Sequence, residues 1–197
     1  MKKRKMYDVA LAMKGFYTLA IMALLAGCFS QRATSIVGGD YDAAKDATNY
    51  FVMPYGEVSL PGKWEKCGYN KESSQQFFKN KDSVIVAVSF TRYDKYEFNK
   101  DGALKGNDFV KAFYEWDSKY FESNGFSRQI IETDLIKQSI IYRIYGEKVN
   151  TYFLIKEKNG YVSNYSINYT DKWSDSEKIQ FLKSLIGNPT EFSIKER

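Results

Sequence analysis

The dipeptide Asn159-Gly160 constrains the fold of this chain more than any other short stretch of its sequence. Asn-Gly is typical of a type I′ turn, since both central residues of that turn need a positive φ. Two strand-like segments, residues 150–158 and 161–169, lie directly before and after it. In the second segment the aromatic and aliphatic side chains at 161, 165, 167 and 169 alternate with Val162, Asn164, Ser166 and Asn168. The pattern predicts an antiparallel hairpin with one face in the core and the other mostly hydrated.

Several other segments have the composition or the alternation of β-strands. Residues 83–93 (SVIVAVSFTRY) are rich in β-branched side chains, and every second residue from Val84 to Phe90 falls on one side, which predicts a central strand. Residues 50–64 contain two short apolar stretches around Pro54-Tyr55-Gly56, which predicts another hairpin. We also predict strands at residues 63–69, 73–79, 126–132 and 136–145.

Two segments have helical periodicity. In residues 108–123, aromatic side chains recur at the spacing of one helical face: Phe109, Phe113, Trp116 and Tyr120. Gly125 can end this helix in the left-handed conformation. Near the C-terminus, residues 174–177 (SDSE) fit a capping box at the start of a helix that Gly187 ends. The inward stripe of this second helix consists of Ile179, Leu182 and Leu185.

The order of strands, helix, strands and helix predicts an α+β fold in which two helices pack on a mostly antiparallel sheet. Together with residues 56–64 (GEVSLPGKW), this order resembles the Mog1/PsbP-like α/β/α sandwich. Members of that family commonly open with a hairpin that leads through a Pro-Gly turn into Trp, here residues 58–64, and finish with a helix, here residues 176–186. Because many members look like assembly or accessory factors, the resemblance implies a domain without a catalytic site, and no functional residue carries over from it.

A lipocalin-like β-barrel is the alternative fold. Gly62-Lys63-Trp64 is similar to the G-x-W at the first strand of such barrels, some of which are bacterial lipoproteins. A helix in the middle of the chain, at residues 108–123, argues against a continuous up-and-down barrel.

The first 27 residues have the plan of a bacterial lipoprotein signal peptide. A basic segment (MKKRK) precedes an apolar run at residues 16–25, which is shorter than the roughly 20 apolar residues that span a bilayer. Leu25-Ala26-Gly27-Cys28 closely resembles the lipobox, in which the bond before the cysteine is cut and its sulfur receives a diacylglyceryl group. We therefore expect cleavage between Gly27 and Cys28, and lipidation of Cys28 with fatty acids such as palmitate.

This interpretation divides the chain into a signal peptide (1–27), a lipidated flexible tether (28–48), a single globular domain (49–188) and a C-terminal tail (189–197). The tether is predicted because residues 28–48 lack sustained periodicity and contain Gly38-Gly39. Two acyl chains hold a protein stably on a membrane, so we expect the mature chain to be anchored through Cys28. Phe29 stands where Asp would retain a lipoprotein at the inner membrane, which favours the outer membrane, facing the periplasm.

The composition argues against several classes of function. The formal net charge is +5, but residues 1–27 hold five basic side chains and one acidic, so 24 basic and 23 acidic side chains remain. We therefore expect no nucleic-acid partner. The chain has no histidine, which excludes Ser-His-Asp and Cys-His catalysis and H-E-x-x-H zinc sites. The two cysteines, Cys28 and Cys67, form no CxxC motif, and we interpret Cys67 as a small buried side chain. We expect no cofactor and no catalytic residue.

Residues 97–108 (EFNKDGALKGND) have part of the spacing of a twelve-residue calcium loop. Glu97, Asn99 and Asp101 stand at positions 1, 3 and 5, and Asp108 stands at position 12. A connecting loop with a helix N-cap at Asn107 or Asp108 explains the same residues. We leave this alternative open and predict no metal ligand.

The expected function is that of a membrane-anchored envelope lipoprotein whose domain binds a protein partner or assists assembly, without enzymatic activity. The alternative is a carrier that holds a small apolar ligand in an aromatic-lined cavity, since the chain contains 16 Tyr and 14 Phe. An internal cavity favours the carrier, whereas a large exposed aromatic patch favours the partner binder.

Overall fold

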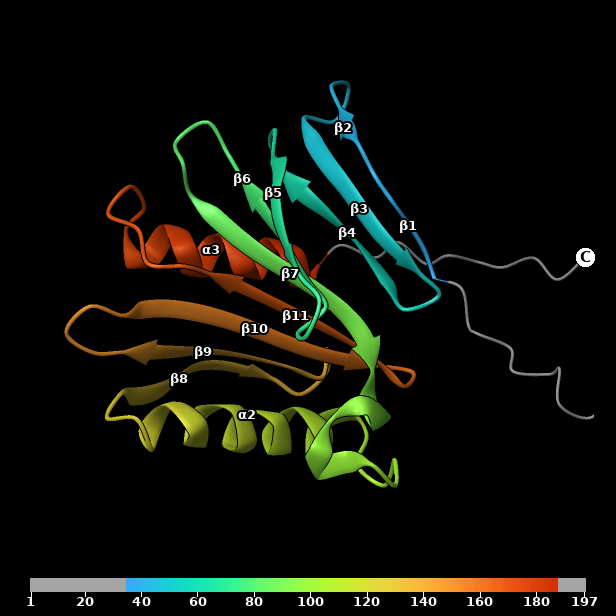
Figure 1. The fold of residues 1–197 in the computed structure, drawn as a ribbon, viewed down its shortest axis with the longest axis vertical. Helices are drawn as coiled ribbons and strands as arrows, with labels where there is room; N and C mark the ends of the chain where they lie inside the picture. The colour runs from blue at the N-terminus through green and yellow to red at the C-terminus, as the bar shows by residue number, and fades with distance from the viewer. Residues whose placement is uncertain (1–34, 188–197) are drawn as a thin grey trace, which may run out of the picture. The chain divides into compact units, whose positions relative to one another are not determined.

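A computed structural model describes residues 35–187 of the chain, and these residues form two antiparallel sheets and two α-helices (Figure 1). The larger sheet has seven strands in the order β5-β6-β7-β11-β10-β9-β8, and every neighbouring pair is antiparallel. Its strands are β5 (Glu65–Asn70), β6 (Gln75–Lys79), β7 (Ile85–Arg92), β8 (Ser127–Asp134), β9 (Ser139–Tyr145), β10 (Asn150–Lys158) and β11 (Tyr161–Ile167). The sheet is open, because its edge strands β5 and β8 do not pair with each other in the described part of the chain. The lipocalin-like alternative is therefore not supported.

The smaller sheet precedes the larger one in the chain. It consists of β1 (Ile36–Gly38), β2 (Tyr41–Asp42), β3 (Ala47–Met53) and β4 (Gly56–Pro61), with β3 pairing with each of the other three. The hairpin predicted within residues 50–64 is β3–β4. The tether prediction for residues 28–48 is wrong over its second half: β1, β2 and the start of β3 lie there because their backbone groups pair with β3 and β4.

The two helices, α2 (Gly106–Glu122) and α3 (Asp175–Ile186), pack on opposite faces of the seven-stranded sheet. On one face, α3 and β4 bury the side chains that alternate along β7 and β11, among them Val86, Val88, Tyr165 and Ile167. On the other face, α2 packs on β8, β9 and β10. The fold is thus α+β, mostly antiparallel, with two packed helices, and the short helical turns η1 (Tyr93–Lys95) and η2 (Glu97–Asn99) connect β7 to α2.

The local sequence signals are confirmed at three points. Asn159 and Gly160 have φ values of 55° and 84°, and the β10–β11 hairpin closes with Lys158 opposite Tyr161. Ser174 caps α3 in a capping box, since its hydroxyl accepts a hydrogen bond from the Glu177 N–H and the Glu177 carboxylate accepts one from the Ser174 N–H. Strand β7 is an interior strand between β6 and β11.

Two predictions about buried faces need correction. In α2, Phe109 and Phe113 are buried, but Trp116 and Tyr120 are 40% and 69% exposed. The buried stripe instead includes Val110 and Tyr114, because the side of the helix that carries them faces β8–β10. In β11, Val162 is as fully buried as Ile167, since elements cover both faces of the sheet there.

The start of α2 is fixed by a carboxylate from another strand. The predicted N-cap at Asn107 or Asp108 is wrong: the N-cap residue is Lys105, whose side chain makes no capping bond. The buried Glu157 of β10 accepts hydrogen bonds from the N–H groups of Gly106 and Gly160. One side chain therefore connects the N-terminus of the helix to the β10–β11 turn.

Candidate functional site

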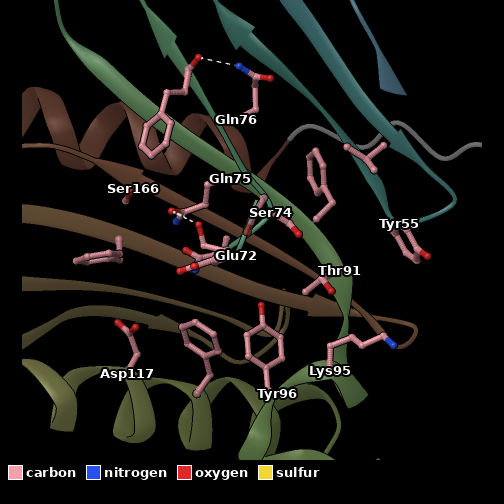
Figure 2. Close-up of a pocket in the computed structure, with 18 of the residues that line it drawn as sticks. Tyr55, Glu72, Ser74, Gln75, Gln76, Thr91, Lys95, Tyr96, Asp117 and Ser166 are labelled. Atoms are coloured by element: carbon pink, nitrogen blue, oxygen red, sulfur yellow. Dashed lines mark hydrogen bonds between the residues drawn. The ribbon is translucent and has the colours of Figure 1, made fainter. Parts of the chain in front are cut away.

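A cleft of about 1360 Å³ lies on the α2 face of the seven-stranded sheet and is also lined by Val37, Tyr50, Val52 and Tyr55, from β1, β3 and the β3–β4 turn. Helix α2 packs on β8, β9 and β10, and the cleft extends beside it over β11, β7 and β6 (Figure 2). Ser89 of β7 and Asn164 of β11 are directly opposite each other across the strand pair, and Ser166 is two residues farther along β11. These side chains form the floor of the cleft, together with Thr91.

The floor is polar but carries no charge. Ser89 and Ser166 are each only 5% exposed, and residues 35–187 make no hydrogen bond to either hydroxyl group. The Oδ1 atom of Asn164 is also buried and lacks a hydrogen-bond partner within the described residues. Buried polar groups are nearly always hydrogen-bonded in folded proteins, so the unpaired amide oxygen of Asn164 on an interior strand is unusual. This oxygen and the two neighbouring hydroxyl groups are available to a ligand or to water in the cleft.

Aromatic rings form the wall on the α2 side. The centroid of Tyr96 lies 5.1 Å from that of Phe113 and 6.0 Å from that of Trp116, and Phe113 lies 5.8 Å from Trp116. Phe153 of β10 stacks on Tyr142 with a centroid distance of 4.9 Å, which fixes its ring beside the floor. Such clusters supply a large apolar surface with defined geometry.

The opposite wall is the turn between β5 and β6. It contains Glu72, Ser73 and Ser74, and Figure 2 shows Tyr96 and Asp117 projecting from the α2 side toward it. The turn is held by its own side chains: Asn70 Oδ1 accepts a hydrogen bond from the Glu72 N–H at 2.9 Å, and the Ser73 hydroxyl donates to Gln75 Oε1 at 2.9 Å. The cleft therefore lies between a helix and a hairpin turn, with the sheet beneath.

Asp117 is a partly buried carboxylate in this site. Burial raises its pKa above the ordinary value of 3.8, and the hydroxyl of Tyr142, which donates to Oδ2 at 2.6 Å, partly opposes that shift. Burial, together with the Asp117 carboxylate, raises the pKa of Tyr142 well above 10.0. At the rim, Arg92 is paired with Asp94, with Nε 3.0 Å from Oδ1. These charged groups are thus engaged with partners of their own chain.

The predicted lipidation and cleavage residues, Cys28 and Gly27, lie outside the described residues. Cys67 is exposed, so its interpretation as a buried side chain is wrong: β5 is an edge strand, and Cys67 falls at a register shift between Lys66 and Gly68. Trp64 of the VSLPGKW stretch is buried, donates from Nε1 to the Pro61 carbonyl at 2.7 Å and packs against Trp173 and Phe181. That stretch therefore contributes to the core.

The residues considered as a calcium loop form a connection with internal hydrogen bonds. Asn99 is buried, its Oδ1 accepts from the Leu104 N–H at 2.8 Å, and its Nδ2 donates to the Tyr93 and Leu104 carbonyls. The Asp101 carboxylate accepts from the Ala103 N–H at 3.1 Å. No group of three or more His, Cys, Asp or Glu side chains suited to a metal ion occurs within residues 35–187.

Sequence reasoning missed the cleft. The polar residues that line it are visible in the sequence of two predicted strands. These are Ser89 and Thr91 in residues 83–93, and Asn164, Ser166 and Asn168 in residues 161–169. The second set was interpreted as a hydrated face, which agrees with a cleft that solvent can enter. That the two sets are neighbours follows only from the pairing of β7 with β11.

Solved structures resemble this chain at low sequence identity. No family model matches the sequence, and no curated protein matches it. Among solved structures, the chain is similar to the solution structure of cyanobacterial PsbP (CyanoP) from Synechocystis sp. PCC 6803, with 13% sequence identity and a TM-score of 0.40. The match covers 81% of this chain and 96% of that one. The α+β fold class rests on the strand order and on the two helices themselves.

Proposed function

We propose that this chain is a lipid-anchored envelope protein whose domain is a non-catalytic binding module, and that the cleft beside α2 is its binding site. The observation that carries the proposal is the floor of the cleft, where Asn164 Oδ1 is buried without a partner in the described part of the chain, beside the hydroxyl-bearing side chains of Ser89 and Ser166. Leaving a buried polar group unpaired costs about 1–3 kcal/mol, whereas apolar residues at the same positions carry no such penalty. A ligand that pairs with these groups gives them a function that offsets this cost.

Binding without catalysis is supported by the state of two of the charged groups. Asp117, the carboxylate in the cleft, accepts a hydrogen bond from Tyr142, and Arg92 at the rim is paired with Asp94. A general acid or base must be free to reach the proton that it transfers. The floor and the α2 wall present hydroxyls, an amide and aromatic rings, which bind and orient ligands, and Glu72, Lys95 and Glu97 are the other charged side chains of the lining.

The anchor is proposed on the sequence of the leader. The lipobox-like stretch ends at Cys28, and diacylglyceryl attachment there holds the mature chain on the envelope membrane, with the outer membrane facing the periplasm as the preferred location. Neither helix within residues 35–187 is long and apolar enough to cross a membrane.

The aromatic wall is the one observation that favours the second candidate, a carrier of a small apolar ligand. Apolar ligands are usually held in enclosed pockets of about 300–1,000 Å³ with few polar groups. This cleft is larger, at about 1360 Å³, and has a polar floor. We therefore prefer a binding module for a ligand that is itself polar.

Site-specific photocrosslinking tests the cleft as a binding site. A benzophenone amino acid replaces Trp116, which lines the cleft, or Tyr120, which lies one turn along the same helix, is more exposed and does not line it. Irradiation of cells of the native host should give an adduct, detected by mass, on the Trp116 variant and none on the Tyr120 variant. Equal labelling of both positions, or none at Trp116, refutes the cleft as the binding site.

The anchor is tested separately by the Cys28→Ser variant. Wild type should incorporate labelled palmitate and sediment with membranes, whereas the variant should incorporate none and keep its uncleaved leader. Unchanged palmitate incorporation in the variant refutes the lipobox interpretation. The proposal for the cleft does not depend on this result.

A further inference from the structure

We infer that the cleft takes a neutral saccharide chain, an inference that rests on the proposed function and names the ligand class for that site. The first reason is the chemistry of the floor. Ser89, Thr91 and Ser166 offer hydroxyl groups and Asn164 an amide, side chains that can donate or accept hydrogen bonds but carry no charge. A ligand that bears many hydroxyl groups can satisfy both kinds of partner at once.

The second reason is that the charged side chains lining the cleft are of both signs: Glu72, Glu97 and Asp117 are acidic, and Arg92 and Lys95 are basic. Asp117 is hydrogen-bonded by Tyr142 inside the site, and Arg92 forms an ion pair with Asp94 at the rim. Glu72, Lys95 and Glu97 also line the cleft, so that acidic and basic groups are mixed there. A strongly charged ligand would be desolvated without a matching counter-charge, which is costly.

The third reason is the wall. A sugar ring has hydroxyl groups around its edge and apolar C–H faces, and those faces pack on aromatic rings. Trp116 is 40% exposed beside Tyr96 and Phe113, so its indole surface is open to the cleft. An apolar wall beside a hydroxyl-bearing floor matches a ligand with both kinds of surface.

An extended peptide fits the site less well. Peptides that add a strand use the free backbone groups of a sheet edge. The floor lies on β7 and β11, whose backbones already pair with β6, β10 and each other. An amphipathic helix needs an apolar groove, whereas the centre of this floor is polar. Recognition here depends on side chains.

Binding is measured on the full mature chain in detergent, with cellotetraose, chitotetraose and maltotetraose as probes. Trp116 is the tryptophan that lines the cleft, since Trp64 and Trp173 pack together near α3, so saccharide binding should change the tryptophan emission. We expect at least one probe to bind with a Kd below about 10 mM. The emission change should be lost in Trp116→Phe.

Two isosteric variants distinguish the cleft from the rest of the surface. Thr91→Val removes a hydroxyl from the floor, and Thr133→Val removes one from the exposed face of edge strand β8. Thr91→Val should weaken binding by about 2–10-fold, the loss expected for one neutral hydrogen bond, and Thr133→Val should leave it unchanged. Asn164→Leu is expected to weaken binding by at least as much.

The outcomes separate this inference from the proposed function. No response to any of the three probes at about 10 mM, or equal effects of Thr91→Val and Thr133→Val, overturns the saccharide assignment. If photocrosslinking at Trp116 then yields a protein or peptide adduct, the ligand class is wrong and the binding function stands. If no adduct forms either, both proposals fail.

Discussion

Glu157→Gln tests whether one buried carboxylate holds the α2 helix in place beside the cleft. In the wild type, Glu157 accepts hydrogen bonds from the Gly160 N–H, at 2.6 Å, and from the Gly106 N–H at the start of α2. Hydrogen bonds to a charged group are worth about 1.5–3 kcal/mol each. Glutamine keeps one acceptor oxygen but turns an NH₂ donor toward the second N–H, so one bond is lost and the other becomes a neutral one.

The expected loss in the free energy of unfolding is therefore about 2–4 kcal/mol. The favourable interaction of a negative charge with the helix N-terminus, about 0.3–1 kcal/mol, is lost as well and lies within that range. For a domain of this size each kcal/mol lowers the midpoint by roughly 2–4 °C, so thermal unfolding should shift by roughly 5–15 °C. Hydrogen exchange should show the amides of α2 losing protection first.

Glu147→Gln is the matched control, because Glu147 is exposed in the β9–β10 connection and takes part in no ion pair within residues 35–187. We expect it to change stability by less than about 0.5 kcal/mol. If Glu157→Gln behaves like this control, the two backbone bonds to Glu157 do not stabilise the start of α2, and another contact must hold that helix in place.

Three further predictions follow from individual residues. Asp117→Asn should flatten the pH dependence of stability. Burial raises the pKa of Asp117, so the folded wild type binds more protons than the unfolded chain, and its free energy of unfolding falls as pH rises from 3.8 through the raised pKa. Parallel urea titrations of both proteins measure this, and identical slopes would contradict it. Ser174→Ala should cost about 1 kcal/mol through loss of the α3 cap, whereas Ser176→Ala, an exposed neighbour, should be near neutral in the same denaturation assay. Gly160→Ala should cost about 1–2 kcal/mol because φ is 84° there and an added Cβ would lie 3.1 Å from the Tyr93 ring; a change within error in thermal unfolding would refute this.

Sequence reasoning succeeded where the cause of a structure lies within a few residues. The turn at Asn159-Gly160 depends on the φ preferences of those two residues, and the cap at Ser174 depends on Glu177 three residues later. Both are present in the structure because no distant contact has to form first. The alternation in β7 was correctly interpreted for the same reason, since successive side chains on a strand point to opposite faces.

Sequence reasoning failed where a distant element decides which side is covered. In α2, the aromatic spacing fits a stripe through Trp116 and Tyr120, but burial depends on how the helix lies on β8–β10. That packing leaves Trp116 at the edge of the cleft. The exposed ring of Trp116, which the periodicity assigned to the core, thus became part of the candidate site.

Cys67 shows the same limit and gives a direct test of the corrected placement. A lone cysteine is most often a buried small side chain, and only the position of β5 at the edge of the sheet, with a register shift at Cys67, explains its exposure. In the Cys28→Ser chain, Cys67 is the single thiol. A maleimide should label it in the native protein within about tenfold of the rate in urea, because an exposed thiol needs no opening of the fold. A buried thiol reacts only after the structure opens, which would slow labelling by about a thousandfold or more for a domain of ordinary stability. Labelling slowed by that factor would show that Cys67 lies in the core. The assignment of β5 to the sheet edge would then be wrong, and so would the β5–β6 turn as a wall of the cleft.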